Sequence, residues 1–417
     1  MFALVDANSF YCSAEQVFRP DWRGKPVIVL SNNDGCVVAA NRQAREAGIE
    51  KFKPFFEVRA RCESAGAIVC SSNYELYGDL SDRMMQVIGR FAPEQHVYSI
   101  DESFLSFHRC RAIPDLRAHA EELRRAVWKE CRLPVGVGMG STLTLAKAAN
   151  HAAKKMAGYQ GVCVLDTEAE RVEVLSRMAA GDVWGIGRRI SARLKAEGIE
   201  TALQLSRAKP GLIRKSFNVE VERTVRELNG EVCNGWDAAR ADKKQIFSTR
   251  SMGERITEFD SLRQALCKHA GIAAAKLRAQ GSLCSVLMVF AGNSPYDERP
   301  KSFKQVYRFP FPADDTTVIT KAVASLVPAL FQEGVRYYKV GVGLVDLVSA
   351  AHVQPDLFDT QPGNPALMNA FDVLNRRFGT GAVFMAAQGI DPKWGMRRAF
   401  LSPQYTTRWG DLPVVRC

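Results

Sequence analysis

Short apolar runs alternate with longer amphipathic stretches through the first 165 residues of this 417-residue chain. The pattern predicts strands over 2–6, 26–30 and 135–139, and helices over 10–18 and 115–130. A further helix is expected from Val37 to Glu46, closed by Gly48, after a polar loop. This alternation is typical of an α/β unit that carries an insertion.

Three carboxylates stand at the ends of two such runs. Asp6 follows the run 2–5, and the pair Asp101-Glu102 follows the run 96–100. We expect the second run to be a buried strand that pairs with 103–107 as a hairpin around the acids. A charge at the end of a buried strand is costly unless it is paired, and a hard divalent cation such as Mg²⁺ pairs with several carboxylates at once. The pattern therefore indicates phosphoryl transfer with two metal ions.

The middle of the chain predicts a different structure. Gly185 and Gly187 form a tight turn ahead of a helix within 181–205, which is typical of a helix-hairpin-helix. Backbone N–H groups at such a turn suit a phosphate, although an ordinary helical corner has the same glycines. After a polar linker at 232–247, we expect an α+β domain with helices over 262–279 and 315–331 and strands over 283–290 and 337–345.

From Asn364 the pattern predicts one capped amphipathic helix. Asn364 has the position of the N-cap, Pro365 that of the first helical residue, and Gly379 that of the stop. The apolar face is expected to contain Leu367, Phe371, Leu374 and Phe378. This face can dock on the rest of the chain or on a partner, and the sequence leaves both open.

The composition of the chain favours nucleic acid as a partner. The net charge is +11, and residues 239–348 carry 16 Lys and Arg against 10 Asp and Glu. Such an excess favours an acidic partner, although a solvated basic surface has the same charge. No apolar run reaches about 18 residues, so we expect no membrane span. The eleven cysteines contain no C-x-x-C, which favours a reducing compartment.

Two motifs surround the three acids. They read Val5-Asp6-Ala7-Asn8-Ser9-Phe10-Tyr11-Cys12 and Tyr98-Ser99-Ile100-Asp101-Glu102-Ser103-Phe104. Together they resemble the two metal-binding motifs of the Y-family DNA polymerases, the translesion enzymes. Within that family, the segment Asn32-Asn33-Asp34-Gly35-Cys36 and the C-terminal residues 364–417 are similar to the UmuC branch.

The resemblance implies template-directed DNA synthesis past damaged bases, as part of an error-prone SOS response. Asp6, Asp101 and Glu102 would hold two Mg²⁺ ions, which Mn²⁺ can replace, and the Ala7 carbonyl would be a further ligand. Tyr11 would be the steric gate, a ring that leaves no room for a 2′-hydroxyl on the incoming sugar. Without the motif, Tyr11 would be interpreted as a core aromatic of the first helix.

The same resemblance implies a cradle for the triphosphate. Arg42, Arg45 and Lys154 match or replace family residues that grip the phosphates, and Lys147 lies two helical turns before Lys154 on the same face. Many relatives have Tyr at the position of Arg42 and Pro at the position of Lys155. Lys155 is therefore an alternative to Lys154.

The resemblance also implies contacts with primer-template DNA and with other proteins. Gly185, Gly187 and Arg188 would bind DNA phosphates. The segment 354–358 is similar to the peptide by which bacterial polymerases bind the β sliding clamp, with Gln354, Leu357 and Phe358 as its contacts. A UmuD′-like dimer and the RecA filament are further expected partners, and the expected location is the cytoplasm, at the nucleoid.

The implied fold is an α+β multidomain polymerase in the form of a right hand. The expected parts are a ferredoxin-like palm (1–24 and 78–165), small fingers (25–77), a helical thumb with the helix-hairpin-helix (166–238), an α+β little finger (243–348), and a C-terminal region with the clamp motif and a partner-binding tail (349–417). Two alternatives keep part of the pattern. A nucleotidyl cyclase on a palm-like fold needs the acids but not Tyr11, and a non-catalytic DNA-binding scaffold needs the basic surface and the tail but not all three acids.

Overall fold

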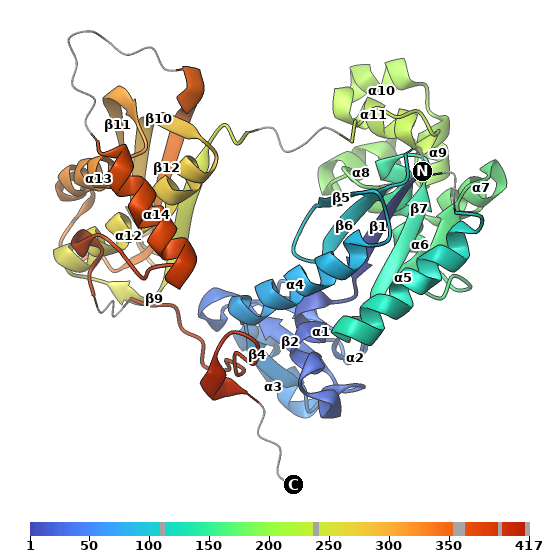
Figure 1. Cartoon of the computed structure of the whole chain (residues 1–417), viewed down its shortest axis with the longest axis horizontal. Helices are drawn as coiled ribbons and strands as arrows, with labels where there is room; N and C mark the ends of the chain where they lie inside the picture. The colour runs from blue at the N-terminus through green and yellow to red at the C-terminus, as the bar shows by residue number, and fades with distance from the viewer. Residues whose placement is uncertain (109, 111–112, 237–241, 353–362, 391–393, 413–417) are drawn as a thin grey trace. The chain divides into compact units, whose positions relative to one another are not determined.

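The chain folds into two compact units, shown in Figure 1. The first contains residues 1–239 and 399–417, and the second contains residues 240–398. The computed structural model describes residues 1–108, 110, 113–236, 242–352, 363–390 and 394–412. The expected clamp peptide at 354–358 lies outside the described residues, and the domain boundaries expected from the sequence stay predictions.

A five-stranded sheet forms the centre of the first unit, with the strand order β5-β6-β1-β7-β8. Its strands are β1 (Phe2–Ala7), β5 (Glu94–Val97), β6 (Glu102–Ser106), β7 (Val135–Gly140) and β8 (Val162–Leu165). The central strand, β1, pairs antiparallel with both β6 and β7. The predicted strands at the N-terminus and at 135–139 are confirmed, because both runs are buried on their two faces.

Helices cover both faces of this sheet. They are α4 (Tyr74–Gly89), α5 (Leu116–Cys131) and α6 (Leu143–Lys155), whereas α1 (Phe10–Val17) follows β1 and packs against α4. Ala3 and Val5 belong to the core that contains α4 and α5, whereas Leu4 packs with Ala146 of α6. Successive side chains on a strand point to opposite faces, so Asp6 lies on the same face as Leu4, under α6.

Three glycines of β7 bring α6 unusually close to the sheet. Gly136, Gly138 and Gly140 alternate along the strand and therefore face α6 together. A Cβ atom at Gly138 would lie 2.0 Å from the backbone nitrogen of Asn150, and one at Gly140 would lie 2.7 Å from the Leu145 Cβ. Only glycine permits this approach, which brings the polar side chains of α6 over the end of β1.

A three-stranded sheet with the order β3-β2-β4 follows β1 and α1. It consists of β2 (Val27–Leu30), β3 (Val37–Ala40) and β4 (Ile68–Ser71), with helices α2 (Arg42–Glu46) and α3 (Phe55–Ser64). The helix predicted over 37–46 is wrong in its first half, because Val37–Ala40 is a strand. Its β-branched residues pair with β2, and the Asn41 side chain then caps α2 by accepting a hydrogen bond from the Ala44 N–H at 2.9 Å.

Five α-helices complete the first unit after β8. They are α7 (Glu168–Arg177), α8 (Arg188–Ala196), α9 (Ala202–Arg207), α10 (Pro210–Ser216) and α11 (Val219–Leu228). Glu227 of α11 is fully buried and accepts a hydrogen bond from the Thr144 N–H at 3.1 Å, at the start of α6. The helical part of the unit is therefore joined to the central sheet through α6.

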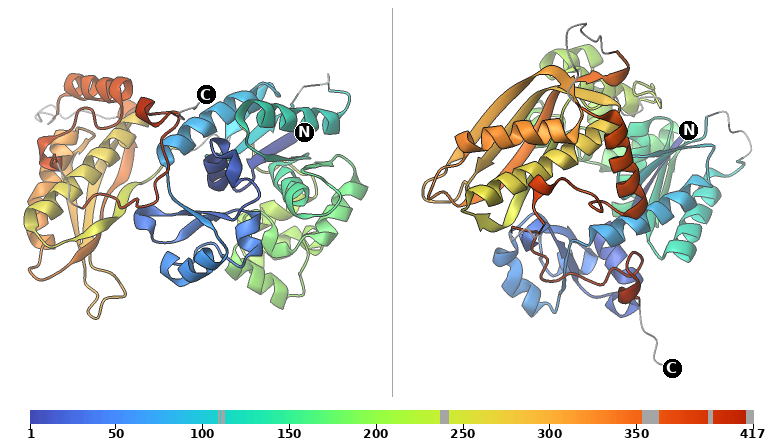
Figure 2. Two further views of the ribbon diagram at one scale, coloured as in Figure 1. Left: turned by 90° about the horizontal axis from the view of Figure 1, so that it is seen from below. Right: turned by 60° about the vertical axis from the view of Figure 1, so that its left-hand side comes forward.

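The second unit is a four-stranded antiparallel sheet with the order β11-β10-β12-β9. Its elements are β9 (Ile246–Ile256), α12 (Phe259–Ala279), β10 (Ser282–Gly292), β11 (Ser302–Ala313), α13 (Thr316–Leu330), β12 (Tyr337–Ser349) and α14 (Pro365–Phe378). The core lies between the sheet and the helices α12 and α13 (Figure 2). The α+β prediction is confirmed, but it missed β9 and β11, whose outward residues are too polar or mixed to read as strands.

One detail of the predicted elements was wrong. The run at 96–100 is not a buried strand, because β5 ends at Val97 and forms an exposed edge of the sheet. On α14 the buried residue is Met368, whereas Leu367, Leu374 and Phe378 of the expected apolar face are between 39% and 65% exposed. The N-cap at Asn364 is confirmed by its hydrogen bond from the Leu367 N–H.

Within the described residues, no helix has both the length and the apolar character to cross a membrane.

Candidate active site

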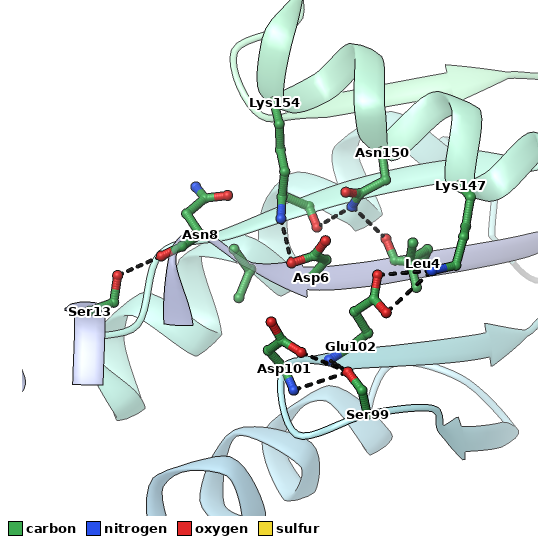
Figure 3. A network of polar contacts seen from close by, with 12 residues as sticks. Leu4, Asp6, Asn8, Ser13, Ser99, Asp101, Glu102, Lys147, Asn150 and Lys154 are labelled. Atoms are coloured by element: carbon green, nitrogen blue, oxygen red, sulfur yellow. Dashed lines mark hydrogen bonds and ion pairs between the residues drawn. The ribbon is translucent and has the colours of Figure 1, made fainter. Parts of the chain in front are cut away.

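The three acids lie together at the end of β1 (Figure 3). Asp6 stands opposite Glu102 in the antiparallel pairing of β1 with β6. Asp101 is one residue earlier, and its carbonyl accepts a hydrogen bond from the Ala7 N–H at 2.9 Å. The hairpin predicted around the acids is present, since β5 pairs antiparallel with β6. The acids meet because β1 and β6 are neighbours in the sheet, although they are almost 100 positions apart along the chain.

Ser99 fixes the loop that carries Asp101. Its hydroxyl donates to Asp101 Oδ1 at 2.7 Å and accepts hydrogen bonds from the N–H groups of Asp101 and Glu102 at 3.3 and 3.1 Å. A carboxylate held by a local hydrogen bond of this kind loses little conformational freedom when it takes a ligand. Ser99 is thus a site residue that the motif contained but that sequence reasoning did not single out.

Two lysines of α6 face the acids across the sheet. Lys147 Nζ lies 3.0 and 3.2 Å from the two carboxylate oxygens of Glu102, and Lys154 Nζ forms an ion pair with Asp6. All four side chains are between 15% and 21% exposed. The lysines are two helical turns apart, so one face of α6 places one cation over each acid. Lys155, the alternative to Lys154, is exposed instead.

Burial and charge act against each other at Asp6. Burial raises the pKa of the Asp6 carboxyl to about 6. Lys154 offsets part of this rise, and the neighbouring charges of Glu102 and Asp101 add to it. Burial also lowers the pKa of Lys154, although the three acids partly restore it. The site thus confines like charges that a further cation would stabilise.

The donor set fits a hard divalent cation. Within the described residues, no three His, Cys, Asp or Glu side chains already converge as a metal-binding group, and two of the acids point to lysines instead. Mg²⁺, however, keeps several waters and takes only one or two carboxylates together with substrate phosphates. Three adjacent carboxylates, of which two are compensated by side chains that can rotate away, meet that requirement.

Lys147 is held by aromatic rings as well as by Glu102. Its ammonium group lies 4.6 Å from the ring centre of Tyr98, 5.2 Å from that of Trp184 and 5.8 Å from that of Phe104. Cation–π contacts of this kind stabilise the ammonium group in this position. Trp184 directly precedes the Gly185 turn, so the helical part of the unit reaches the acid site through this residue.

Asn150 is a further residue whose role sequence reasoning missed. Its amide nitrogen donates to the carbonyl oxygens of Leu4 and Gly136 at 3.2 and 2.8 Å, which ties α6 to the adjacent strands β1 and β7. The signal was present as the spacing of Lys147, Asn150 and Lys154, which share one face of a helix. These residues line a pocket of about 280 Å³ together with Asp6, Glu102 and Trp184.

Tyr11 lies close to the acids, on α1. Its ring stacks on that of Tyr77, with ring centres 4.6 Å apart and an angle of 18° between the planes, and Tyr74 meets it edge-on at 6.2 Å. Burial raises the pKa of the Tyr11 phenol, and the charges of Tyr74 and Asp101 add to this shift. The ring is therefore only partly buried, is fixed by neighbouring aromatics, and is near one of the acids.

The structure does not bring Arg42 to the acids. Its side chain is 80% exposed and pairs with Glu46 on its own helix, at 2.7 Å. Arg45 lies nearer to α1, since its charge partly offsets the rise in the pKa of the buried Cys12 thiol. Of the three residues expected to hold the triphosphate, only Lys154 has an ion pair with one of the three acids of the site.

The glycine turn before α8 has the expected geometry. Gly185 has a φ of 87°, in the left-handed region that favours glycine, and Gly187 is the N-cap of α8 with no side chain to cover the first N–H groups. Arg188 follows at the first helical position and is exposed. The end of the helix is thus open to an anion.

Comparisons with known proteins decide the family. Residues 5–151 match the impB/mucB/samB family, residues 243–357 match the C-terminal domain of that family, and residues 365–415 match a domain of unknown function, DUF4113. The protein UmuC of Salmonella typhimurium is 43% identical over 422 residues, which cover the whole of both chains. This chain belongs to the UmuC-like Y-family polymerases.

Other relatives agree with this assignment. MucB of Escherichia coli is 41% identical over 420 residues, covering 100% of this chain and 99% of that one. DNA polymerase IV of Moorella thermoacetica is 27% identical over 92% of this chain and 94% of its own length. Among solved structures, a Y-family polymerase chimera of Dbh and Dpo4 matches with a TM-score of 0.65 at 18% identity, covering 84% of this chain and all of that one. This last likeness shows the fold of a palm, fingers and little finger.

Proposed function

We propose that this UmuC-like chain copies primed DNA templates past damaged bases by adding deoxynucleotides to a primer end. The observation that carries the proposal is that Asp6, Asp101 and Glu102 lie together at the end of β1, with Lys154 and Tyr11 beside them. Acids that can hold metal ions and a cation for the phosphate oxygens are the groups that metal-dependent nucleotidyl transfer requires, and the ring would select the sugar.

Asp6, Asp101, Glu102 and the Ala7 carbonyl are the groups that would hold two Mg²⁺ ions, or Mn²⁺ in their place. When bound, the ions supply an activated primer hydroxyl and offset the charge that develops on the leaving pyrophosphate. The protein's own groups prepare for this. Ser99 orients Asp101, and Lys147 orients Glu102.

Lys154 is placed to exchange one anion for another. In the structure its ammonium group compensates Asp6, which burial has made costly to ionise alone. A bound triphosphate offers three or more negative oxygens to the same ammonium group, which is a point charge on a long stem. Arg45 is proposed as a second phosphate contact, whereas the exposed Arg42 would have to leave Glu46 to take part.

Tyr11 is proposed as the steric gate. Its face is covered by Tyr77 and its edge by Tyr74, so the ring cannot turn aside for a bulkier sugar. We expect Tyr11→Ala to raise the use of ribonucleotides relative to deoxynucleotides by about 100-fold, by analogy with the discrimination that a shaped pocket gives to a single group. The matched control is Tyr296→Ala, at a tyrosine 95% exposed in the second unit. Unchanged sugar discrimination in Tyr11→Ala would refute the gate.

The second unit is proposed to grip duplex DNA through the face of its sheet opposite α12 and α13. Lys304 and Arg308 alternate with inward residues on β11 and are exposed, as is Lys339 on β12. These groups suit phosphates and carry no base specificity. In the first unit, the open end of α8 is proposed as a separate phosphate contact. Affinity for primer-template should therefore fall by about 100-fold or more between 50 and 200 mM salt. A flat salt response would contradict phosphate contacts as the main source of affinity.

The proposed partners are the β sliding clamp, a UmuD′-like dimer and the RecA filament, in an SOS response at the nucleoid. The clamp contact rests on Gln354, Leu357 and Phe358, which the structure does not describe, so it stays a prediction from the sequence. Deleting Leu357 and Phe358 should abolish stimulation by the clamp and spare basal synthesis. Equal loss of both activities would count against the motif.

Primer extension with Asp101→Ala tests the proposed function directly. We expect extension of a primed template to disappear in this variant, whether the chain is assayed alone or with the proposed partners. The matched control is Asp82→Ala, at an exposed aspartate of α4. Extension that survives in Asp101→Ala would overturn the mechanism.

A further inference from the structure

Residues 399–405, which we call the C-terminal strap, return from the second unit to the first (Figure 1). The strap runs beside the end of β4. The Ala399 N–H donates to Asp34 Oδ2 at 2.8 Å, and the Phe400 N–H donates to Ser71 Oγ at 2.9 Å. The Phe400 carbonyl in turn accepts from the Ser71 N–H at 2.9 Å. Backbone and side-chain bonds thus hold the strap in one register.

Aromatic contacts attach the strap to two parts of the first unit. Phe400 meets Phe55 of α3 edge-on, with ring centres 5.8 Å apart. Tyr405 stacks on Phe18, at the end of α1, with ring centres 4.7 Å apart. The strap therefore bridges the three-stranded sheet with its helices and the helix that carries Tyr11.

Ser402 is the buried centre of the strap. The amide of Asn73, at the N-cap of α4, donates to the Ser402 carbonyl and hydroxyl at 3.1 and 2.9 Å. The Ser402 hydroxyl donates to Glu15 Oε1 at 3.0 Å, and the same oxygen accepts from the Tyr77 hydroxyl at 2.6 Å. Asn73, Tyr77 and Glu15 are each at most 1% exposed. The network is thus sealed from solvent.

This network ends at the proposed steric gate. Tyr77 donates to Glu15 at its hydroxyl and stacks on Tyr11 with its ring, 4.6 Å away and nearly parallel. A ring whose hydroxyl is fixed can neither rotate nor slide, so Tyr11 rests on a fixed surface. The order of contacts is Ser402, Glu15, Tyr77 and Tyr11.

Apart from these hydroxyl groups and the Cys70 thiol, little holds Glu15 in place. Its second oxygen, Oε2, is buried without a hydrogen-bond partner among the described residues, and no lysine or arginine pairs with Glu15 there. A buried carboxylate that loses a donor loses a large share of its compensation, because the cost of its desolvation remains. Removing the Ser402 hydroxyl should therefore displace Glu15, and Tyr77 with it.

We propose that the strap is a selectivity element of the polymerase, in which Ser402 positions the stack of Tyr77 and Tyr11 and thereby sharpens discrimination against ribonucleotides. Ser402 is a positioning residue, since it acts through Glu15 and Tyr77 and does not meet the nucleotide. The inference rests on the proposed role of Tyr11. It gives the C-terminal domain of unknown function a task inside its own polymerase.

Ser402→Ala in the full-length chain tests this inference. The assay is single-nucleotide insertion on a primed template, with the accessory proteins under which the wild type is active. We expect the ratio of kcat/KM for ribonucleotides to that for deoxynucleotides to rise about fivefold, the change that one buried hydrogen bond supplies. Deoxynucleotide insertion should stay within about twofold of wild type. The matched control, Thr407→Ala, removes an exposed hydroxyl nearby and should change neither quantity.

A second pair of variants separates positioning from general weakening. Tyr77→Phe breaks the same network from its other end and should raise the ratio by a similar factor. The double variant should show less than the product of the two single effects, because both act through Glu15. Ser402→Thr keeps the hydroxyl and should restore wild-type discrimination.

Three results would overturn the inference, and they are distinguishable. If Tyr11→Ala admits ribonucleotides while Ser402→Ala and Tyr77→Phe discriminate like wild type, the gate stands and the strap has no part in it. If Tyr11→Ala itself leaves discrimination unchanged, the gate fails and the inference fails with it. A lower melting temperature in Ser402→Ala with unchanged discrimination would assign the strap a structural role only.

Discussion

The acid site and the strap network each contain a carboxylate for which burial is costly, and these carboxylates are compensated in different ways. At the acid site, Asp6 and Glu102 keep about a fifth of their side-chain surface exposed and face Lys154 and Lys147. In the strap network, Glu15 is 1% exposed and receives hydrogen bonds from two hydroxyl groups and the Cys70 thiol, with no lysine or arginine beside it among the described residues. Burial raises the pKa of the carboxyl group in both Asp6 and Glu15.

The difference shows which carboxylates are available for chemistry. A lysine at the end of a long stem can turn away when another cation or an anionic substrate arrives, and an open side gives that ligand access. Hydroxyl groups of packed residues cannot leave, so Glu15 is a fixed part of the structure. The pKa direction alone does not distinguish the two sites, whereas the partner and the remaining exposure do.

The strongest test of this contrast replaces one acid without changing its shape. Asp6→Asn should lower the rate of nucleotide insertion by about 10³-fold or more, because a neutral amide cannot hold a cation in place of the carboxylate. Its melting temperature should change little, since the raised pKa shows that the charge is costly in the fold. Insertion kinetics and thermal unfolding measure the two effects. If Asp6→Asn failed to fold, Asp6 would be required for the fold, which contradicts its assignment to the chemistry of the site.

Glu15→Ala should show the opposite behaviour. It leaves the hydroxyl groups of Tyr77 and Ser402 buried without their acceptor and opens a cavity, which together should cost about 4 kcal/mol of unfolding free energy. Chemical denaturation of the first unit's transition measures this. Exposed Glu121 of α5 offers the control Glu121→Ala, which should lie within about 0.5 kcal/mol of wild type. If Glu15→Ala were as stable as wild type, Glu15 would not be a residue that stabilises the fold.

The second unit also contains a buried ionisable residue, His269. We expect it to make the stability of this unit depend on pH. Burial lowers the pKa of His269 from 6.5 to about 4, and the nearby charges of Arg250, Lys268 and Lys276 add to the shift. The unfolded chain therefore takes up the proton first as the pH falls. The stability of this unit should be complete above about pH 6.5 and fall by about 3 kcal/mol as the pH approaches 4.

Denaturation of wild type and of His269→Gln between pH 7 and pH 4 measures this loss of stability. The glutamine variant should lose less stability over that interval, because it has no proton to take up. Ser248, whose hydroxyl lies 2.8 Å from His269 Nδ1, can still hydrogen-bond to the amide. Parallel curves for the two proteins would show that His269 does not carry the dependence.

Of these four substitutions, Asn150→Ala should have the smallest effect. It tests whether Asn150 contributes to the stability of the fold, to the rate of insertion, or to both. The loss of donors to the Leu4 and Gly136 carbonyls should cost about 2 kcal/mol. Because α6 also places Lys147 and Lys154, insertion should slow by about tenfold, through small displacements of both cations. Normal activity at reduced stability would show that Asn150, like Glu15, stabilises the fold and has no part in catalysis.

The expectations from sequence succeeded where the signal is local. Asp6 and Tyr11 are five positions apart at a strand–helix junction, and the apolar run before Asp6 is a buried strand as predicted. The cap of α14 at Asn364 was equally readable, because a cap needs only its own first turn. The prediction failed at Val37–Ala40, where pairing with β2 outweighs the helical pattern of the following residues.

The sequence by itself determined the acids, the ring beside them and the family to which the chain belongs, because each is recorded in a short continuous segment. Only the tertiary structure decided that Lys147 compensates Glu102, that Asn150 ties α6 to β1 and that Ser402 reaches Glu15. Ser402 and Glu15 are almost 390 positions apart, and neither belongs to a motif. Contacts of this kind arise from packing, which depends on the whole chain at once and leaves no local pattern to recognise.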